Sequence, residues 1–344
     1  MTSTPLRWSA EGPAVVVLDQ TRLPAATVEL VCADVPALVD AIQRLAIRGA
    51  PLLGIAGAYG VALAAARGDD VVSAAHMLGR ARPTAVNLAT GVGHALDAWQ
   101  RSGGDAGAVL AAAQSLQAAD AAASAAIATA GLPLVPRRGR VLTHCNTGRL
   151  VSGGDGTALA VVFAAHRAGR LERLWVGETR PLLQGARLTA WEAEQAGVPY
   201  SVVGDSAVAS LFSRGLVDVV LVGADRISAD GSVANKVGTY GIAVIAARHG
   251  VPFVVAAPTS TIDLGTPDGD AIVIEERPAD EVTAYAGTAV APAGASAYNP
   301  AFDVTPPDLI NAIVTERGIV TPVTTDTVAA IMAATVENGV TMKA

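Results

Sequence analysis

The sequence predicts an α/β protein with two domains. Residues 1–130 are expected to form a small, mostly helical N-terminal domain with short initial strands, and residues 131–344 a Rossmann-like domain with a doubly wound parallel sheet. Before residue 130, apolar residues recur at helical spacing without a convincing alternating strand. Beyond Pro133, short β-rich runs are each followed by a turn and an amphipathic helix, which is typical of a parallel sheet. With 344 residues, 51% of them hydrophobic, the chain can bury both cores.

In the first domain, two short strands precede the helices. They are predicted at residues 14–19 and 26–32. The helical spacing then predicts helices at 36–46, in the glycine-rich run after Arg48, and at 71–78, 88–101 and 106–129.

The glycine-rich run 49–66 contains no charged residue and approaches the length of a membrane span. Four glycines and Pro51 interrupt its leucines, which makes the run a poor match to lipid. We therefore expect a buried helix that packs closely through its glycines, and no membrane partner.

The same patterns place the elements of the second domain. Strands are predicted at 140–144, 173–176, 200–203, 217–222 and 252–256, and helices at 156–168, 181–196, 206–213 and 237–249. A loop rich in proline, alanine and glycine follows at 291–300. After it, Val304-Thr305-Pro306-Pro307 has the pattern of a helix N-cap followed by proline, and a last helix is expected at 327–337.

Charge and cysteine content restrict the class of function. The net charge of −7 gives no general attraction for a nucleic-acid backbone, so any phosphate must be held by local groups. Two cysteines are too few for a disulfide framework. The N-terminus has no basic start followed by a long apolar run, so no signal peptide is expected. These features predict a cytoplasmic protein that does not bind nucleic acid.

The residues that follow each predicted strand of the second domain are unusually polar. Because ligands bind outside the carboxyl ends of the strands in an open parallel sheet, these residues are candidates for a site. They are His144-Cys145-Asn146-Thr147-Gly148, Glu178-Thr179-Arg180, Gly204-Asp205, Gly223-Ala224-Asp225-Arg226 and Pro258-Thr259-Ser260-Thr261. We expect the five strand ends to meet at one crevice.

Two of these strand-end residues are candidates for catalysis. Asp225 follows a strongly apolar strand, which can withdraw its carboxyl from water, raise its pKa and suit it to acid/base chemistry near neutral pH. The alternative is that Asp225 caps its loop or pairs with Arg226. Cys145 is by default a small buried apolar residue. His144 is not an obvious partner for it, because neighbours on a strand point to opposite faces unless the chain turns there.

Lysine is rare in this chain. Of the 24 basic residues, 22 are arginine, and the two lysines are Lys236 and Lys343. A lone internal lysine favours a position that needs a compact, rotatable ammonium group, and chance is the alternative. Asn235 and Lys236 follow the turn at Asp230-Gly231 and precede a predicted helix, where an anion can bind.

A second polar group comes near the start of the predicted helix 181–196. Arg180, Gln184 and Arg187 are spaced to line one helix face. Near a helix N-terminus such a face can hold a phosphate or sugar hydroxyls, and the alternative is a solvated surface.

Common cofactor and metal motifs are missing from the sequence. It has no G-x-G-x-x-G after a strand, no G-x-x-x-x-G-K-[ST] and no G-x-S-x-G. The five histidines are scattered, with none at metal-ligand spacing. We therefore expect neither a cofactor nor a metal, and the remaining class is metal-free chemistry on a phosphorylated small molecule.

Seven ordered stretches become informative when they are taken together. They are Ala46-Ile47-Arg48-Gly49-Ala50-Pro51, Arg82-Pro83-Thr84-Ala85-Val86-Asn87-Leu88, Thr143-His144-Cys145-Asn146-Thr147-Gly148, the run from Glu178 to Thr189, Gly223-Ala224-Asp225-Arg226-Ile227, the run from Val233 to Tyr240, and Asn299-Pro300-Ala301-Phe302-Asp303. Together they resemble the methylthioribose-1-phosphate isomerases, within the larger family shared with the alpha, beta and delta subunits of eukaryotic initiation factor two B. The resemblance spans nearly the whole chain.

The resemblance implies a role for each matched position. Asp225 would be the proton donor, and Cys145 a non-nucleophilic group that stabilises the transition state. The implied substrate contacts are Arg48, Gly49, Ala50, Arg82, Gln184, Asn235 and Lys236. The resemblance also implies a homodimer that converts the aldose 5-methylthioribose 1-phosphate to the ketose 5-methylthioribulose 1-phosphate in methionine salvage.

Two departures from the family pattern leave the substituent at C5 of the sugar open. They are Ala89-Thr90-Gly91, where aromatic residues are common, and Ser152-Gly153-Gly154-Asp155-Gly156 after the Cys145 loop. Ribose-1,5-bisphosphate isomerase is the nearest rival and would need a second phosphate site. A regulatory subunit without catalysis is the rival from another class, and the presence of both Cys145 and Asp225 argues against it.

Overall fold

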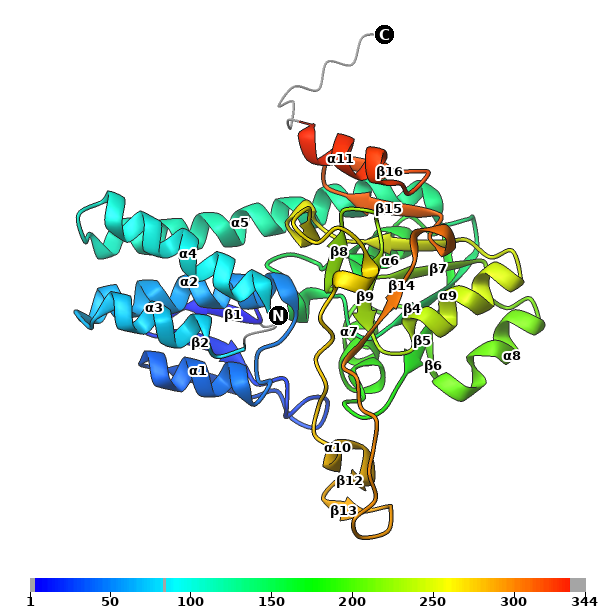
Figure 1. Cartoon of the computed structure of the whole chain (residues 1–344), viewed down its shortest axis with the longest axis horizontal. Coiled ribbons are helices and arrows are strands. Elements are labelled where there is room, and N and C mark those ends of the chain that lie inside the picture. The colour runs from blue at the N-terminus through cyan, green and yellow to red at the C-terminus, as the bar shows by residue number, and fades with distance from the viewer. Residues whose placement is uncertain (1–3, 83–84, 335–344) are drawn as a thin grey trace.

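The computed structural model describes residues 4–82 and 85–334, and it shows a helical part beside a sheet part (Figure 1). The predicted α/β class is confirmed, with mostly helical elements followed by a Rossmann-like sheet. Helices α1 to α4 lie at one end of the molecule, and the long helix α5 packs against both parts. A slender arm containing α10 (Asp280–Thr283), β12 (Ala284–Tyr285) and β13 (Thr288–Ala289) projects from the sheet part.

The chain begins with a small antiparallel sheet of β1 (Leu6–Trp8), β2 (Val15–Leu18) and β3 (Glu29–Cys32). The sequence predicts β2 and β3 but not β1, because three residues carry too short a pattern. The five expected helices follow as α1 (Val35–Gln43), α2 (Ala50–Arg67), α3 (Val71–Gly79), α4 (Val86–Arg101) and α5 (Ala106–Gly131). Asp34, Asp70 and Asp105 accept backbone N–H bonds at the starts of α1, α3 and α5, which sets where these helices begin.

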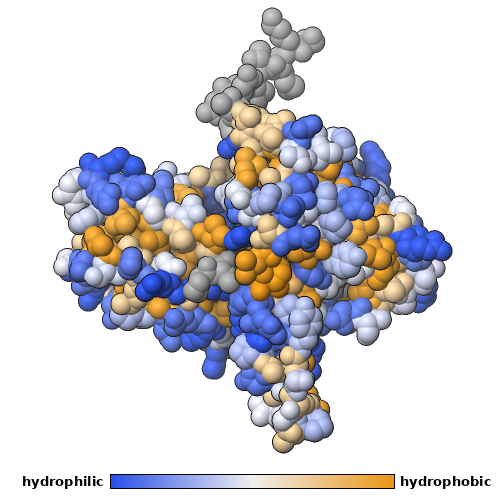
Figure 2. All heavy atoms as spheres, viewed as in Figure 1, coloured by the Kyte–Doolittle hydropathy of each residue, from blue (hydrophilic) through white to orange (hydrophobic). Residues whose placement is uncertain are grey.

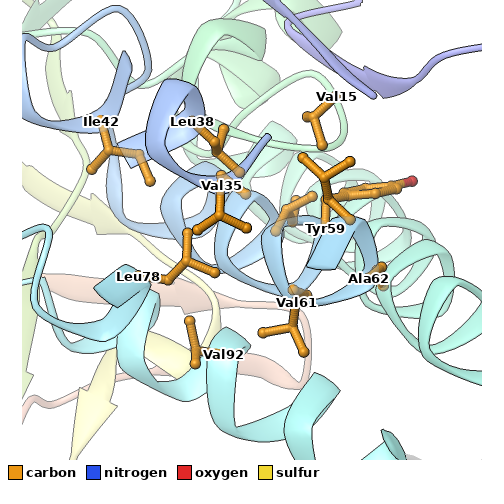
Figure 3. Packing of buried hydrophobic residues seen from close by; sticks show 14 of the residues in the cluster. Val15, Val35, Leu38, Ile42, Tyr59, Val61, Ala62, Leu78 and Val92 are labelled. Atoms are coloured by element: carbon orange, nitrogen blue, oxygen red, sulfur yellow. The ribbon is translucent and has the colours of Figure 1, made fainter. Parts of the chain in front are cut away.

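Helix α2 is the core of the helical part. Figure 3 shows its residues Tyr59, Val61 and Ala62 among side chains of α1, α3 and α4. By length and hydropathy α2 could span a membrane, yet 72% of it is buried inside the protein. A Cβ added to Gly91 of α4 would overlap the backbone of Gly54 in α2. The predicted buried helix, packed through its glycines, is therefore confirmed.

The large sheet has seven strands in the order β16-β15-β10-β7-β4-β5-β6. Their bounds are β4 (Gly139–His144), β5 (Leu171–Glu178), β6 (Tyr200–Gly204), β7 (Val219–Val222), β10 (Phe253–Ala256), β15 (Ala312–Thr315) and β16 (Gly318–Val320). All neighbours pair in parallel except β15 and β16. Five of these strands are the predicted ones, and the short strands β15 and β16 were not predicted.

Helices cover both faces of this sheet. Val219 and Leu221 of β7 belong to a core that includes side chains of α5, α6 (Ala158–Arg167) and α7 (Ala190–Gln195). Val220 and Val222 belong to the opposite core, with α8 (Val208–Ser213), α9 (Thr239–Arg248) and α11 (Thr325–Ala333). Strands buried on both faces lose the alternation of apolar and polar residues, which explains the continuous apolar run of β7.

A second sheet, absent from the sequence-based prediction, has the order β11-β8-β9-β14. Its strands are β8 (Arg226–Ser228), β9 (Val233–Lys236), β11 (Ile262–Asp263) and β14 (Phe302–Thr305). The predicted helix start at Val304-Thr305-Pro306-Pro307 is wrong, because Val304 and Thr305 pair with β9 and only a 3-10 turn, Pro307–Leu309, follows. Pairing between distant segments outweighs the local capping pattern here.

Two other predicted helices also differ from the structure. Instead of one helix over 181–196, a π-helical turn, Gly185–Thr189, leads into α7. A Cβ on Gly185 would overlap the carbonyl oxygen of Gly177, so the turn lies directly on the end of β5. The final helix α11 begins at Thr325, and the end predicted for it at residue 337 lies outside the described residues.

Candidate active site

A cavity of about 420 Å³ lies between the helical part and the carboxyl ends of the sheet strands. It is lined by Leu45, Arg48, Gly49 and Arg82 from the helical part, and by Cys145, Leu182, Gln184, Asp225, Lys236, Arg277, Ala301 and Phe302 from the sheet part. An adjoining cavity of about 570 Å³ shares Gly49, Arg82, Asp225 and Phe302 with it. On the face of the molecule seen in Figure 2, hydrophobic residues are exposed near the middle, where the helical part adjoins the sheet part.

The structure brings eight of the nine predicted site residues to these two cavities. Seven line the smaller cavity, and Ala50 lines the larger one. Asn235 is the exception. Its neighbours Ala234 and Lys236 on β9 line the cavities, whereas the Asn235 side chain donates to Thr239 Oγ1 at 3.1 Å. Because side chains alternate along a strand, Asn235 lies on the opposite face from Lys236.

Asp225 stands just beyond β7 and is partly buried. Its backbone N–H donates to the carbonyl of Ala234 at 2.9 Å, which ties it to β9. Burial raises the pKa of Asp225, while the charges of Lys236 and two arginines oppose that rise. Arg226 lies 3.6 Å from Asp263, so the structure does not support the alternative in which Asp225 is the partner of Arg226.

Cys145 follows β4 in the left-handed backbone region, with φ of 61°, and its side chain is buried. Such a conformation is costly for a residue with a side chain, and residues that adopt it cluster at functional sites. The Nη2 atom of Arg48 lies 3.7 Å from Cys145 Sγ. His144 is directed elsewhere, with its Nε2 2.9 Å from the carbonyl oxygen of Val237. The structure therefore offers Cys145 a cation and not an imidazole base.

Lys236 is buried beside both candidates. Its Nζ donates to the carbonyl of Ala301 at 2.7 Å and lies 4.9 Å from the centre of the Phe302 ring. Burial lowers the pKa of Lys236, whereas the nearby Cys145 and Asp225 raise it. The rare internal lysine of the sequence thus lies within the cavity, close to the carboxyl of Asp225.

Three arginines line the cavity, and two of them are paired with Glu275. Arg48 donates to Asn146 Oδ1 at 2.9 Å and to its carbonyl at 3.3 Å. Arg82 lies 3.4 Å from Glu275, and Arg277 lies 2.9 Å from the other oxygen of the same carboxylate. Clustered guanidinium groups with fixed geometry suit a phosphate.

Gly49, Ala50 and Gln184 supply neutral hydrogen-bonding groups. Gly49 has a φ of 92° and is the N-cap of α2, without a side-chain cap, so the first N–H groups of a long helix begin at the cavity. A Cβ on Gly49 would overlap Val151, which explains the glycine. Gln184 is buried, and its Oε1 has no hydrogen-bond partner among the described residues.

The sequence also suggested residues that do not line these cavities and missed others that do. Arg180 donates to the carbonyls of Val282 and Ala284, and Arg187 to the carbonyls of Leu23 and Gln20. Both arginines hold backbone in place. Phe302 and Ala301 belong to a motif quoted from the sequence but had no assigned role. Arg277 had no sequence signal at all, because only the folding of the segment before the arm brings it to the cavity.

A metal site needs several suitable side chains close together. Within residues 4–82 and 85–334, no group of three or more His, Cys, Asp or Glu side chains is placed to hold a metal ion. Both cysteines, Cys32 and Cys145, are free thiols.

The chain is similar in sequence and in fold to known proteins. Residues 46–322 match the profile of the initiation factor 2 subunit family. The chain belongs to this family. Among relatives of similar sequence, the methylthioribose-1-phosphate isomerase of Anaeromyxobacter dehalogenans is 51% identical over 319 residues, covering 92% of this chain and 93% of the relative. A protein of the same name from Pelotomaculum thermopropionicum is 48% identical over 331 residues, covering 92% and 91%.

Two solved structures share the fold over nearly the whole chain. The 5-methylthioribose 1-phosphate isomerase of Pyrococcus horikoshii OT3 superposes with a TM-score of 0.90 at 35% identity, covering 96% of this chain and 95% of that one. The translation initiation factor eIF-2B subunit delta of A. fulgidus gives a TM-score of 0.84 at 39% identity, covering 96% and 100%.

Proposed function

We propose that this protein is an aldose–ketose isomerase that converts 5-methylthioribose 1-phosphate to 5-methylthioribulose 1-phosphate in methionine salvage. The observation that carries the proposal is the meeting of Asp225 and Cys145 with Arg48, Arg82 and Lys236 in one cavity. Relatives about half identical to the chain carry the name of this isomerase, which supports the same assignment.

The reaction poses a specific chemical difficulty. Because the anomeric oxygen of the substrate carries phosphate, its ring cannot open as a free hemiacetal does. An acid must protonate the ring oxygen as its bond to C1 breaks, a hydrogen must then move from C2 to C1, and the C2 hydroxyl must give up its proton as it becomes the ketone. Substrate and product are isomers, so no oxidant or reductant is consumed.

Asp225 is the proposed source of that proton. Its raised pKa keeps a larger fraction of the carboxyl protonated near neutral pH, as an acid catalyst requires. We assign Cys145 the role of a non-nucleophilic stabiliser, because the neighbouring imidazole of His144 is directed away from it and its sulfur lies beside Arg48. A site buried between the two parts also keeps water from a reactive intermediate.

The phosphate and the 5-methylthio group have separate places in this proposal. Arg82, Lys236 and the N–H groups at the start of α2 would hold the phosphate. The larger cavity has an apolar wall that includes Leu53, Val86, Ile272, Ile274 and Phe302. A thioether fits that wall better than a second phosphate does, which favours the methylthio substrate over ribose 1,5-bisphosphate.

A regulatory subunit without catalysis is the second candidate. The likeness to the structure named as subunit delta of eIF-2B favours it. The strained Cys145, the partly buried Asp225 and the cations around them favour catalysis instead, since a binding module has no need of an acid with a raised pKa.

The test is to assay the purified protein with 5-methylthioribose 1-phosphate and ribose 1,5-bisphosphate side by side. Asp225→Asn and Cys145→Ser should each lower turnover about 100-fold or more while the protein stays folded. Cys32→Ser alters the other buried cysteine, in β3, and should retain turnover. Near-normal turnover in both cavity variants contradicts the assigned roles, and no turnover of any sugar 1-phosphate by the unaltered protein favours the regulatory candidate.

A further inference from the structure

A buried carboxylate behind the Cys145 loop holds that loop in place. Glu192 lies on α7, and its side chain is almost wholly enclosed, with 5% of the residue exposed. We propose that Glu192 is a positioning residue that sets the Cys145–Asn146 loop and, through Asn146, the guanidinium of Arg48. Its kinetic consequence rests on the proposed function, whereas its effect on the loop does not.

Both oxygens of Glu192 accept hydrogen bonds from this loop. The backbone N–H of Arg149 donates to Oε2 at 2.9 Å, and the backbone N–H of Leu150 donates to Oε1 at 2.9 Å. The side-chain amide of Asn146 donates to Oε1 at 3.3 Å. Three donors converge on one group, and a carboxylate is the side chain that accepts at both oxygens.

The loop is shaped to receive this carboxylate. A Cβ added to Gly148 would overlap Oε2 of Glu192, so a larger residue there would displace the carboxylate from its contacts with the loop. Thr189, just before α7, adds a second tie by donating to the carbonyl of Cys145 at 2.6 Å. The Asn146 amide also donates to Thr189 Oγ1 at 3.2 Å. One segment of chain thus holds the loop from Cys145 to Leu150.

The side chain of Asn146 connects Glu192 to Arg48, which lines the cavity. Its Nδ2 atom faces Glu192, while its Oδ1 accepts from Arg48 at 2.9 Å. Arg48 in turn lies 3.7 Å from Cys145 Sγ. If the Asn146 amide turned, Arg48 would keep only its bond to the Asn146 carbonyl, and its guanidinium would be held less firmly beside Cys145.

Burying the carboxylate of Glu192 costs free energy, so this residue does more than fill space. It borders a third cavity of about 600 Å³, lined by apolar residues such as Phe163 and Trp191 and by charged ones such as Arg149 and Asp155. Burial raises the pKa of Glu192 to about 7, which shows how strongly this site disfavours a charge. An apolar residue here would leave the N–H groups of Arg149 and Leu150 without this acceptor, so the loop contacts explain the carboxylate.

The decisive variant is Glu192→Gln, which keeps the size of the side chain but turns one acceptor oxygen into a donor that faces an N–H group. Glu194→Gln is the matched control, because Glu194 lies on the same helix and is exposed. At pH 8.5, where the Glu192 carboxyl is ionised, we expect turnover of 5-methylthioribose 1-phosphate to fall about tenfold or more in Glu192→Gln and to stay unchanged in the control. The two variants should melt within a few degrees of each other.

A second readout reports on the loop without any assay of activity. The alkylation rate of Cys145 by iodoacetamide is followed by mass spectrometry, with Cys32 in β3 as the internal reference. In Glu192→Gln we expect Cys145 to react about fivefold faster or more, as local opening exposes it, while Cys32 is unchanged. A purely structural role would instead raise both rates together and lower the melting temperature.

The proposal is overturned if Glu192→Gln matches Glu194→Gln in turnover and in Cys145 alkylation, or if both cysteines become equally reactive. If Glu192→Gln does not fold, Glu192→Asp provides the test, since it keeps the charge but withdraws it by one methylene. Wild-type alkylation of Cys145 in Glu192→Asp would overturn the proposal. Absence of turnover in the unaltered protein would count against the proposed function alone, because alkylation still tests the loop.

Discussion

Single residues in the cavity have shifted pKa values or a strained backbone conformation. Asp225 and Lys236 are both withdrawn from solvent, and burial shifts the pKa of each toward its neutral form. Each also weakens the shift of the other by its charge. Cys145 adds a strained backbone to this group. The residues proposed for chemistry are therefore those whose burial and strain make no obvious contribution to folding.

The raised pKa of Asp225 predicts how stability depends on pH. The native protein holds this proton to higher pH than the unfolded chain, whose carboxyl titrates near 3.8. Stability is therefore lost as pH rises through that interval. Asp225→Asn removes this loss, so its melting temperature relative to the unaltered protein should be higher at pH 8 than at pH 4. Differential scanning calorimetry at the two pH values measures the difference.

Asp308→Asn provides the control for this prediction, because Asp308 is an exposed aspartate in the same part of the chain. Its effect on the melting temperature should be nearly the same at both pH values. If Asp225→Asn behaves in the same way as Asp308→Asn, the carboxyl of Asp225 has an ordinary pKa and is a weaker candidate for the acid.

At the scale of elements, close contact between backbones positions the walls of the cavity, in addition to the apolar pattern. Helix α4 lies so close to α2 that Gly91 leaves no room for a side chain. The start of α2 carries Gly49 and Ala50 into the cavity, so the same packing positions one wall of the site. On the other side, β9 pairs with β14 and brings Lys236 opposite Phe302.

Two glycines on α4 provide a matched pair for this contact. Gly91→Ala should lower the free energy of unfolding by about 1–3 kcal/mol, because the helices must separate to admit the methyl group. Gly93 has open space around it, so Gly93→Ala should raise the free energy of unfolding by about 0.5–1 kcal/mol through higher helix propensity. Urea unfolding followed by circular dichroism measures both, and equal effects of the two variants would refute the close contact.

At the scale of the whole molecule, the cavity is formed by both parts of the chain. Arg48 and Arg82 come from the helical part, and Asp225 and Lys236 from the sheet part. The ion pair between Arg82 and Glu275 also joins the two parts. A ligand bound here touches both, so its binding should stabilise the molecule as a whole.

Arg82 is therefore a test of ligand binding across the cavity. Adding 5-methylthioribose 1-phosphate should raise the melting temperature of the unaltered protein. In Arg82→Gln the dissociation constant should rise about tenfold or more, because a charged hydrogen bond contributes about 1.5–3 kcal/mol. Arg80→Gln changes an exposed arginine nearby and should bind normally. Isothermal titration calorimetry distinguishes the variants, and equal affinities would remove Arg82 from the site.

The sequence by itself determined the α/β class, the positions of the main helices and five parallel strands, and most of the cavity. The class and the elements follow from local periodicity. Of the five strand ends expected to converge, those that carry Cys145 and Asp225 line the cavity. The contacts from the helical part, such as Arg48 and Arg82, came from the resemblance to a known family. Only the tertiary structure showed that a second sheet forms, that the side chain of Asn235 points away from the cavity, and that Arg277 lines it. It also revealed Glu192 behind the Cys145 loop. These depend on pairing between segments far apart in the chain, which local patterns do not record.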